Sequence, residues 1–157
     1  MNQFTIDILK SLALASGYFA VGIAAIGSSI GAGVAGQAAI GAWRKCYQQG
    51  KTAPFLLLAM VGAPLSQTIY AMIMMIIIKG KILAANANAA SMPTFAVIGV
   101  LGGFALMLSA VFQGKAAAGS CVAFAESNQG FANYLMVLGI IETCAIFALI
   151  FSLMVMP

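Results

Sequence analysis

Residues 36–42 read Gly-Gln-Ala-Ala-Ile-Gly-Ala, and residues 114–120, which lie 78 positions later, read Gly-Lys-Ala-Ala-Ala-Gly-Ser. A second echo, Phe-Ala-Val at residues 19–21 and again at residues 95–97, has nearly the same separation. Self-similarity at a fixed spacing is typical of a duplicated structural unit. The chain is therefore predicted to consist of two related halves with the same elements in the same order.

The composition indicates which solvent surrounds these halves. Of the 157 residues, 63% are apolar and 6% are charged, whereas about a quarter of the residues are charged in an ordinary soluble domain. A chain this short cannot hide so much apolar surface from water, so the composition predicts an integral membrane protein. The net charge of +4 is spread over the chain without a basic and aromatic cluster, which gives no support for nucleic-acid binding.

Four apolar stretches are each long enough to cross a hydrocarbon core, which takes about 20 helical residues. The predicted fold class is an all-α membrane protein with four transmembrane helices in two duplicated hairpins. An N-terminal segment of residues 1–11 precedes the first hairpin, and a loop at 79–92 connects it to the second. The hairpins are 12–78, with spans 12–43 and 54–78, and 93–157, with spans 93–125 and 131–156. An even number of spans gives both hairpins the same orientation.

The first and third spans share a small-residue texture that the other two lack. Glycine recurs through both, Gly27-x-x-x-Gly31 is one example, and Ser109 belongs to the same texture in the third. Small residues let helix backbones approach closely in lipid, where packing holds helices together. Packing within one chain would account for such a face, but two glycine-rich helices beside two bulkier ones favour a homo-oligomeric ring with the thin helices on its inner circle.

One acidic side chain lies inside the predicted spans. Glu142 is about 12 residues beyond the loop before the fourth span, which places it roughly 18 Å deep in the membrane. A carboxylate near the bilayer centre costs at least about 2.5 to 3.5 kcal/mol on insertion scales, and such residues usually mark ion or proton paths. We therefore favour an ion or proton path over a purely structural hydrogen bond.

Other polar side chains are predicted at the depth of Glu142. Gln113 lies about 12 residues before the same loop and hence opposite Glu142, while Ser66, Gln67 and Tyr70 lie about as far past the first loop. A single group of this kind is commonly an interhelical contact worth about 0.6 kcal/mol. Five groups in one layer indicate a site instead.

The ligand types in this layer limit what it can bind. Pro64 has no amide hydrogen, so a carbonyl one turn earlier loses its partner, and freed carbonyls in a membrane interior can be ligands. One carboxylate among neutral oxygens is a hard site without sulfur or imidazole, and its charge suits a monovalent cation. Because burial also favours the neutral form of a carboxylate, a proton is equally possible. Sodium and proton both remain open from the residues alone.

The chain resembles, over nearly its whole length, the proteolipid (the K or c subunit) of V-type and archaeal-type rotary ATPases. Three motifs carry the resemblance: Pro64-Leu65-Ser66-Gln67-Thr68-Ile69-Tyr70, Phe112-Gln113-Gly114-Lys115-Ala116-Ala117 and Ile141-Glu142-Thr143. In that family the fourth-helix glutamate carries the ion. The resemblance implies an ion-binding site made of Glu142, Gln113, Gln67, Ser66, Tyr70 and the carbonyl of Ala63. Of these, Glu142, Gln113, Gln67, Ser66 and Ala63 are the implied direct ligands of Na⁺.

Two departures qualify the resemblance. At the 78-residue separation Ala35 stands opposite Gln113, and Gln67, which lies 75 residues before Glu142, takes the place of the carboxylate in the first hairpin. The first hairpin therefore lacks the carboxylate, and each chain is expected to carry one site. Ser66 replaces the threonine of the sodium-type pattern, which keeps the hydroxyl and favours Na⁺ without excluding H⁺.

The resemblance also implies a mechanism and partners. An ion from a half-channel of the stator membrane subunit would neutralise Glu142, the ring would turn through lipid, and a stator arginine would displace the ion. The implied partners are further copies of the chain in a ring, the stator, a central-stalk subunit and the lipid bilayer. The chain itself is expected to be non-catalytic, since it has no GxxxxGK[ST] loop. No cofactor is expected besides the transported Na⁺ or H⁺. The resemblance implies a multi-pass protein of a prokaryotic plasma membrane.

Other classes of membrane protein explain less of the sequence. A small four-helix secondary transporter with a carboxylate-coupled site accounts for Glu142 and the four spans, but predicts aromatic residues around a wide cavity rather than glycine-rich helices. A structural pore leaves Glu142 without a purpose. A membrane enzyme needs a second catalytic group, and the remaining acids, Asp7 and Glu126, lie near the membrane surfaces.

Overall fold

The structure is a computed structural model, and it describes residues 2–84 and 88–157. All regular structure in these ranges is helical: α1 (Gln3–Gln48), α2 (Leu57–Gly62), the 3-10 turn η1 (Ala63–Leu65), α3 (Ser66–Leu83), the 3-10 turn η2 (Ala89–Ser91), α4 (Met92–Ser127) and α5 (Phe131–Met154). In the part of the chain that the structure describes, four helical stretches are long and apolar enough to cross a membrane: α1, α2 through α3, η2 with α4, and α5. The predicted all-α chain with four such helices is confirmed.

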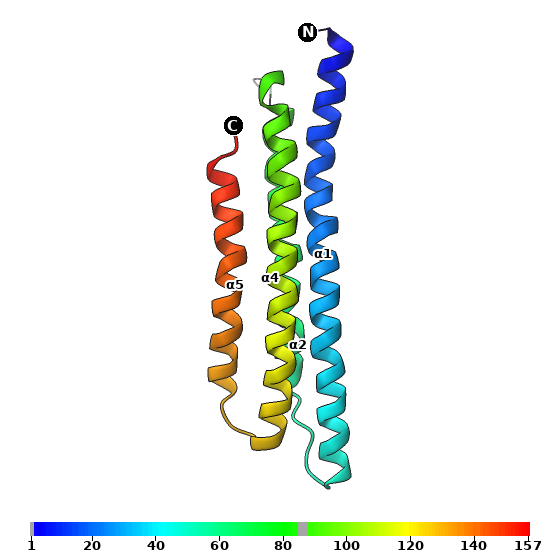
Figure 1. The fold of residues 1–157 in the computed structure, drawn as a ribbon, viewed down its shortest axis with the longest axis vertical. Helices are drawn as coiled ribbons and strands as arrows, with labels where there is room; N and C mark the ends of the chain where they lie inside the picture. The colour runs from blue at the N-terminus through cyan, green and yellow to red at the C-terminus, as the bar shows by residue number, and fades with distance from the viewer. Residues whose placement is uncertain (1, 85–87) are drawn as a thin grey trace.

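Two of the helices are much longer than a bilayer requires. The 46 residues of α1 and the 36 residues of α4 correspond to about 69 and 54 Å, against a hydrocarbon core of roughly 30 Å. Asn2 caps α1, because its side-chain oxygen accepts the amide hydrogen of Thr5 at 2.9 Å. The helix therefore takes in most of the 1–11 segment and extends past the other helices at the N-terminal end (Figure 1).

Short connections join the helices of each hairpin. Between α1 and α2, the indole nitrogen of Trp43 donates to the carbonyl oxygen of Pro54 at 2.8 Å. Between α4 and α5, Asn128 and Gly130 adopt left-handed backbone angles, with φ of 54° and 80°, which these residue types tolerate best. The sequence predicts a loop at residues 79–92. Helix α3 continues into this range and ends at Leu83, and residues 85–87 lie outside the described residues.

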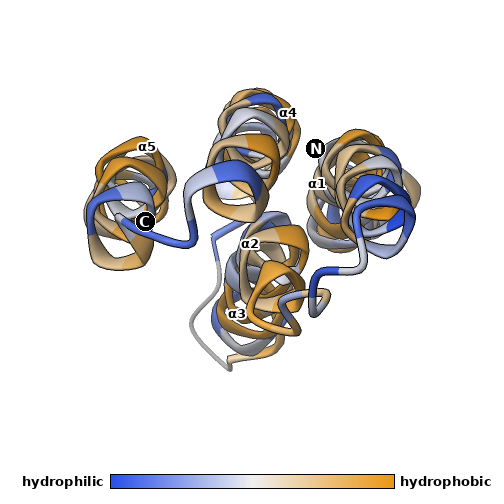
Figure 2. Cartoon of the chain, turned by 90° about the horizontal axis from the view of Figure 1, so that it is seen from below, coloured by the Kyte–Doolittle hydropathy of each residue, from blue (hydrophilic) through white to orange (hydrophobic). Residues whose placement is uncertain are grey.

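The helices run nearly side by side, with α4 between α1 and α5 and with α2 and α3 on one side of this row (Figures 1 and 2). Helix α1 packs along one side of α4 and α5 along the other, while α3 contacts α1, α4 and α5. Hydrophobic residues cover the outward faces as well as the inner ones (Figure 2), and large apolar side chains such as Ile140, Phe147 and Phe151 are exposed on α5. A helix that is apolar on all sides requires a protein or lipid environment around it.

Glycines determine how closely α1 and α4 approach. A Cβ atom on Gly114 would overlap the backbone of Gly31, and one on Gly27 would overlap the backbone of Met107. The two glycine-rich helices thus use these positions for packing within the chain. Among the described residues, a Cβ on others, such as Gly22, Gly33, Gly41 and Gly119, would have no neighbouring atom within 4 Å, so their faces are open in the single chain.

The proline in the second span produces a short 3-10 turn. Around Pro64, η1 interrupts the α-helical pattern. The amide N–H of Ala63 donates to the carbonyl oxygen of Met60. In a regular α-helix this carbonyl would accept a hydrogen bond from residue 64, but Pro64 has no amide hydrogen to donate. The carbonyl oxygen of Ala63 in turn accepts the amide hydrogen of Ser66. The helix changes geometry at the residue where the polar layer begins.

Candidate functional site

Glu142 lies at the middle of α5 and is half-buried. Both of its carboxylate oxygens accept hydrogen bonds from other helices. The hydroxyl of Tyr70, on α3, donates to Oε1 at 2.5 Å, and Nε2 of Gln113, on α4, donates to Oε2 at 3.3 Å. Two neighbouring helices therefore each supply one donor to the carboxylate.

Two glutamines connect this carboxylate to α3. Gln67 and Gln113 are both fully buried, and Nε2 of Gln67 donates to Oε1 of Gln113 at 2.8 Å. Nε2 of Gln113 also donates to the carbonyl oxygen of Leu138 at 3.0 Å. Within residues 2–84 and 88–157, no buried side-chain nitrogen or oxygen lacks a partner. A fully satisfied buried network holds each amide in one orientation.

Neutral oxygens gather where η1 joins α3. Oγ of Ser66 lies 3.1 Å from the carbonyl oxygen of Ala63 and 3.3 Å from Oε1 of Gln67. The 3-10 turn at Pro64 places these groups together, because it brings the Ala63 carbonyl and the Ser66 hydroxyl onto the same side of one turn. The three oxygens are a hydroxyl, a backbone carbonyl and an amide carbonyl, which are all hard ligands without charge.

The structure brings every residue of the predicted site into one hydrogen-bonded layer across α3, α4 and α5. This layer contains Ala63, Ser66, Gln67, Tyr70, Gln113 and Glu142. Their shared depth is thus matched by direct contact. Their role as ion ligands stays a prediction.

The structure adds three groups to this layer that the sequence did not assign to it. Ser109, interpreted from the sequence as a small packing residue, donates its hydroxyl hydrogen to the carbonyl oxygen of Ile141 at 3.2 Å and accepts from Nε2 of Gln67 at 3.4 Å. The carbonyl oxygens of Ile141 and Leu138 are the other two. The spacing of Ser109, four residues before Gln113, was the available signal, because residues four apart share a helix face.

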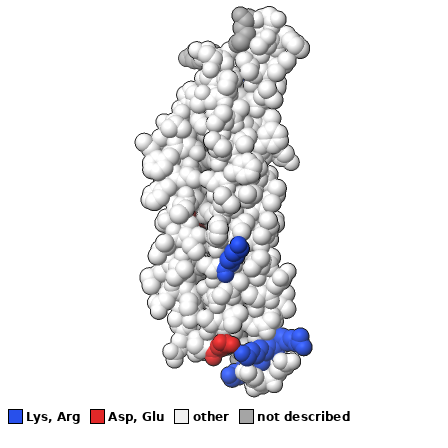
Figure 3. All heavy atoms as spheres, in the orientation of Figure 1, with Lys and Arg blue, Asp and Glu red and all other residues white. Residues whose placement is uncertain are grey.

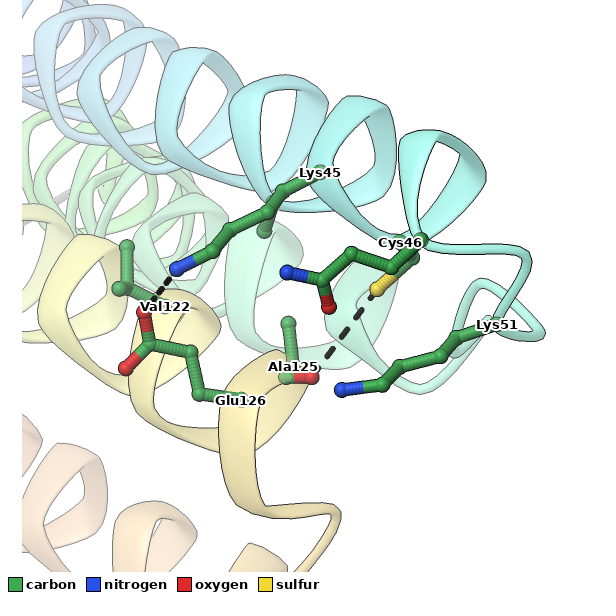
Figure 4. A pocket seen from close by; sticks show the side chains of 8 residues that line it. Lys45, Cys46, Lys51, Val122, Ala125 and Glu126 are labelled. Atoms are coloured by element: carbon green, nitrogen blue, oxygen red, sulfur yellow. Dashed lines mark hydrogen bonds and ion pairs between the residues drawn. The ribbon is translucent and has the colours of Figure 1, made fainter.

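A hollow of about 230 Å³ lies away from this layer, between the loop ends of α1 and α4. It is lined in part by Lys45, Cys46, Lys51 and Glu126, and Nζ of Lys45 lies 2.6 Å from Oε1 of Glu126 (Figure 4). In Figure 3, an acidic side chain and several basic ones gather at this end, whereas most of the face shown is uncharged. Lys45 and Glu126 pair with one another, and the residues that line the hollow lie outside the layer around Glu142.

Comparison with known proteins points to one family. The sequence model of the ATP synthase C-subunit family matches residues 96–155. The matched segment is fewer than half of the residues and covers most of α4 and α5, including Ser109, Gln113 and Glu142. A search of curated proteins gives no match.

The four apolar helices and the family match indicate an integral, multi-pass membrane protein. In the matched segment the chain is similar to the C subunit of ATP synthase, a family of rotor-ring proteolipids in ion-translocating ATPases. The finer assignments, including the type of ATPase and the ion, are proposals.

Proposed function

We propose that the chain is the membrane rotor-ring subunit of a V/A-type ATPase and carries Na⁺ across the membrane on Glu142 during ATP-driven rotation. The observation that carries this proposal is the hydrogen-bonded layer of α3, α4 and α5 around a carboxylate at the middle of a membrane-spanning helix. The family match also supports it, because residues 96–155 include the parts of α4 and α5 that hold Gln113 and Glu142.

Both oxygens of the Glu142 carboxylate are held by donors from neighbouring helices. Tyr70 donates a hydrogen bond to one oxygen and Gln113 donates to the other. An ionised carboxylate that faces lipid is nevertheless costly. A bound cation offsets that cost, so the site is suited to turn through lipid only when it is loaded.

The neutral oxygens near Glu142 favour Na⁺ as the cation. A proton needs one oxygen, whereas Na⁺ needs several, and membrane carriers commonly supply backbone carbonyls for it. Ser66 Oγ, Ala63 O and Gln67 Oε1 lie together on the second span, and Gln113 supplies a further amide oxygen beside them. We propose Glu142, Gln113, Gln67, Ser66 and Ala63 as the ligands of Na⁺, with Tyr70 holding the carboxylate.

The proposed ring explains the exposed apolar faces. Ile140, Phe147 and Phe151 on α5, and Leu65 and Ile69 on the second span, are all more than half exposed in the single chain. Further copies of the chain and lipid would cover them. A stator membrane subunit would load and unload Glu142, a central-stalk subunit would transmit the torque, and a prokaryotic plasma membrane would hold the assembly.

The experiment that tests the proposal is labelling of the purified ring with a hydrophobic carbodiimide, followed by mass spectrometry. We expect the label on Glu142, a loss of labelling when Na⁺ is added, and no label in Glu142→Gln. Labelling that Na⁺ leaves unchanged across a wide pH range would contradict sodium transport and favour protons. An unlabelled Glu142, or an assembly with the mass of a dimer, would contradict the rotor-ring proposal itself.

A further inference from the structure

The hydroxyl of Ser109 lies where three helices meet beside the Glu142 layer. Ser109 belongs to α4, is only 7% exposed, and lies one turn before Gln113 on the same helix face. It contacts α5 through the carbonyl oxygen of Ile141, at 3.2 Å, and α3 through Nε2 of Gln67, at 3.4 Å. Ile141 directly precedes Glu142, so the hydroxyl connects the segment that holds the carboxylate to the glutamine of α3.

The hydrogen-bond donors and acceptors around Ser109 determine which way the Gln67 side-chain amide is oriented. A backbone carbonyl can only accept, and a serine hydroxyl has a single proton. Because Ser109 donates that proton to Ile141, its oxygen can only accept from Gln67. Gln67 must therefore present its NH₂ group to α4, and its carbonyl oxygen Oε1 is turned the other way, toward the hydroxyl of Ser66.

The hydrogen bonds of Gln113 require the same orientation of the Gln67 side-chain amide. Its NH₂ group serves two acceptors that cannot donate, the Leu138 carbonyl and the Glu142 carboxylate. Its oxygen is left to accept from Gln67. The NH₂ group of Gln67 thus has two acceptors on α4, and Ser109 is the one that does not itself contact Glu142.

We infer that Ser109 is a positioning residue of the Glu142 site: its hydroxyl holds the Gln67 amide with the carbonyl oxygen turned toward the transported cation. This inference rests on the proposed function, since it concerns how tightly that site binds Na⁺. Ser109 is not among the proposed ligands, because its hydroxyl joins Ile141 to Gln67 and makes no hydrogen bond to Glu142. A proton on Glu142 needs no oxygen from Gln67, so Ser109 affects binding of Na⁺ and not of H⁺.

The test is the carbodiimide assay on rings that carry Ser109→Ala. Alanine is smaller than serine and favours a helix, so the variant is expected to assemble. We expect the Na⁺ concentration for half-protection of Glu142 to rise about fivefold to tenfold, the size expected for one neutral hydrogen bond. The pH of half-labelling without Na⁺ should not change. Ser120→Ala is the matched control, because Ser120 is equally buried on α4 and its hydroxyl bonds to Ala116 of the same helix.

A second variant tests whether Ser109 acts through Gln67. In a Gln67→Ala background, Ser109→Ala should have no further effect on protection by Na⁺, because interacting residues are not additive. Equal fold changes in both backgrounds would overturn the inference, as would parallel shifts in the Na⁺ and pH midpoints, which indicate a merely structural role. Wild-type and Ser109→Ala rings protected equally by Na⁺ would overturn this inference alone. A wild-type ring without any protection would overturn sodium transport and the inference together.

Discussion

The hydroxyl of Tyr70 provides the sharpest single-atom change at the site. It donates to Oε1 of Glu142 at 2.5 Å, and Tyr70→Phe removes it while the aromatic ring stays in place. A hydrogen bond to a charged group contributes about 1.5 to 3 kcal/mol, and about 1.4 kcal/mol corresponds to a factor of ten in an equilibrium constant. We therefore expect the affinity for Na⁺ to fall by about 10-fold to 100-fold.

The measurement is the Na⁺ concentration that half-protects Glu142 from a hydrophobic carbodiimide in purified rings. Tyr134→Phe is the matched control, because Tyr134 lies near the loop end of α5 and takes no part in the layer around Glu142. The control should bind Na⁺ as the wild type does. If Tyr70→Phe rings are protected at the same Na⁺ concentration as the wild type, the hydroxyl does not hold the Glu142 carboxylate for Na⁺, and the reasoning about the donors is wrong.

Two further predictions concern packing. Gly114→Ala should lower the thermal stability of the assembled ring by about 1 to 3 kcal/mol, because the new methyl group overlaps the backbone of Gly31 in the same chain. A thermal melt that matches the wild type would contradict close packing of α1 on α4. Trp43→Phe should cost about 0.5 to 1.5 kcal/mol, because the hydrogen bond to Pro54 is lost, and should speed proteolysis between α1 and α2. An unchanged cleavage rate would mean that Trp43 does not hold this connection.

Counting residues along the helices predicts from the sequence that the polar groups of this site lie at one level. Hydropathy locates the four spans, and counting residues from the loops at 1.5 Å each places Glu142 and Gln113 at one level. The same count places Ser66, Gln67 and Tyr70 of the second span at this level. The resemblance to the proteolipid family then implies that all of these residues belong to one ion-binding site. Depth is readable because the helical rise is constant.

Direction around each helix is what the sequence does not give. The spans are apolar on all sides, so no amphipathic stripe marks which face of α4 meets α5. The four-residue spacing places Ser109 on the helix face of Gln113, but it does not show which helices that face meets. The structure supplies this by placing the Ser109 hydroxyl between Gln67 and Ile141. For the same reason, the sequence could not predict that Gly31 and Gly114 meet within one chain. Backbone carbonyls such as that of Leu138 carry no sequence signal at all.

Cation transport by the carboxylate itself is tested most directly in membrane vesicles that contain the complete ATPase, by following ATP-driven uptake of radioactive Na⁺. Glu142→Gln keeps the shape of the side chain and removes its charge, and we expect uptake to stop. Glu126→Gln, which changes the acid at the loop end of α4, should transport as the wild type does. Uptake at the wild-type rate in the Glu142→Gln vesicles would contradict transport on this carboxylate.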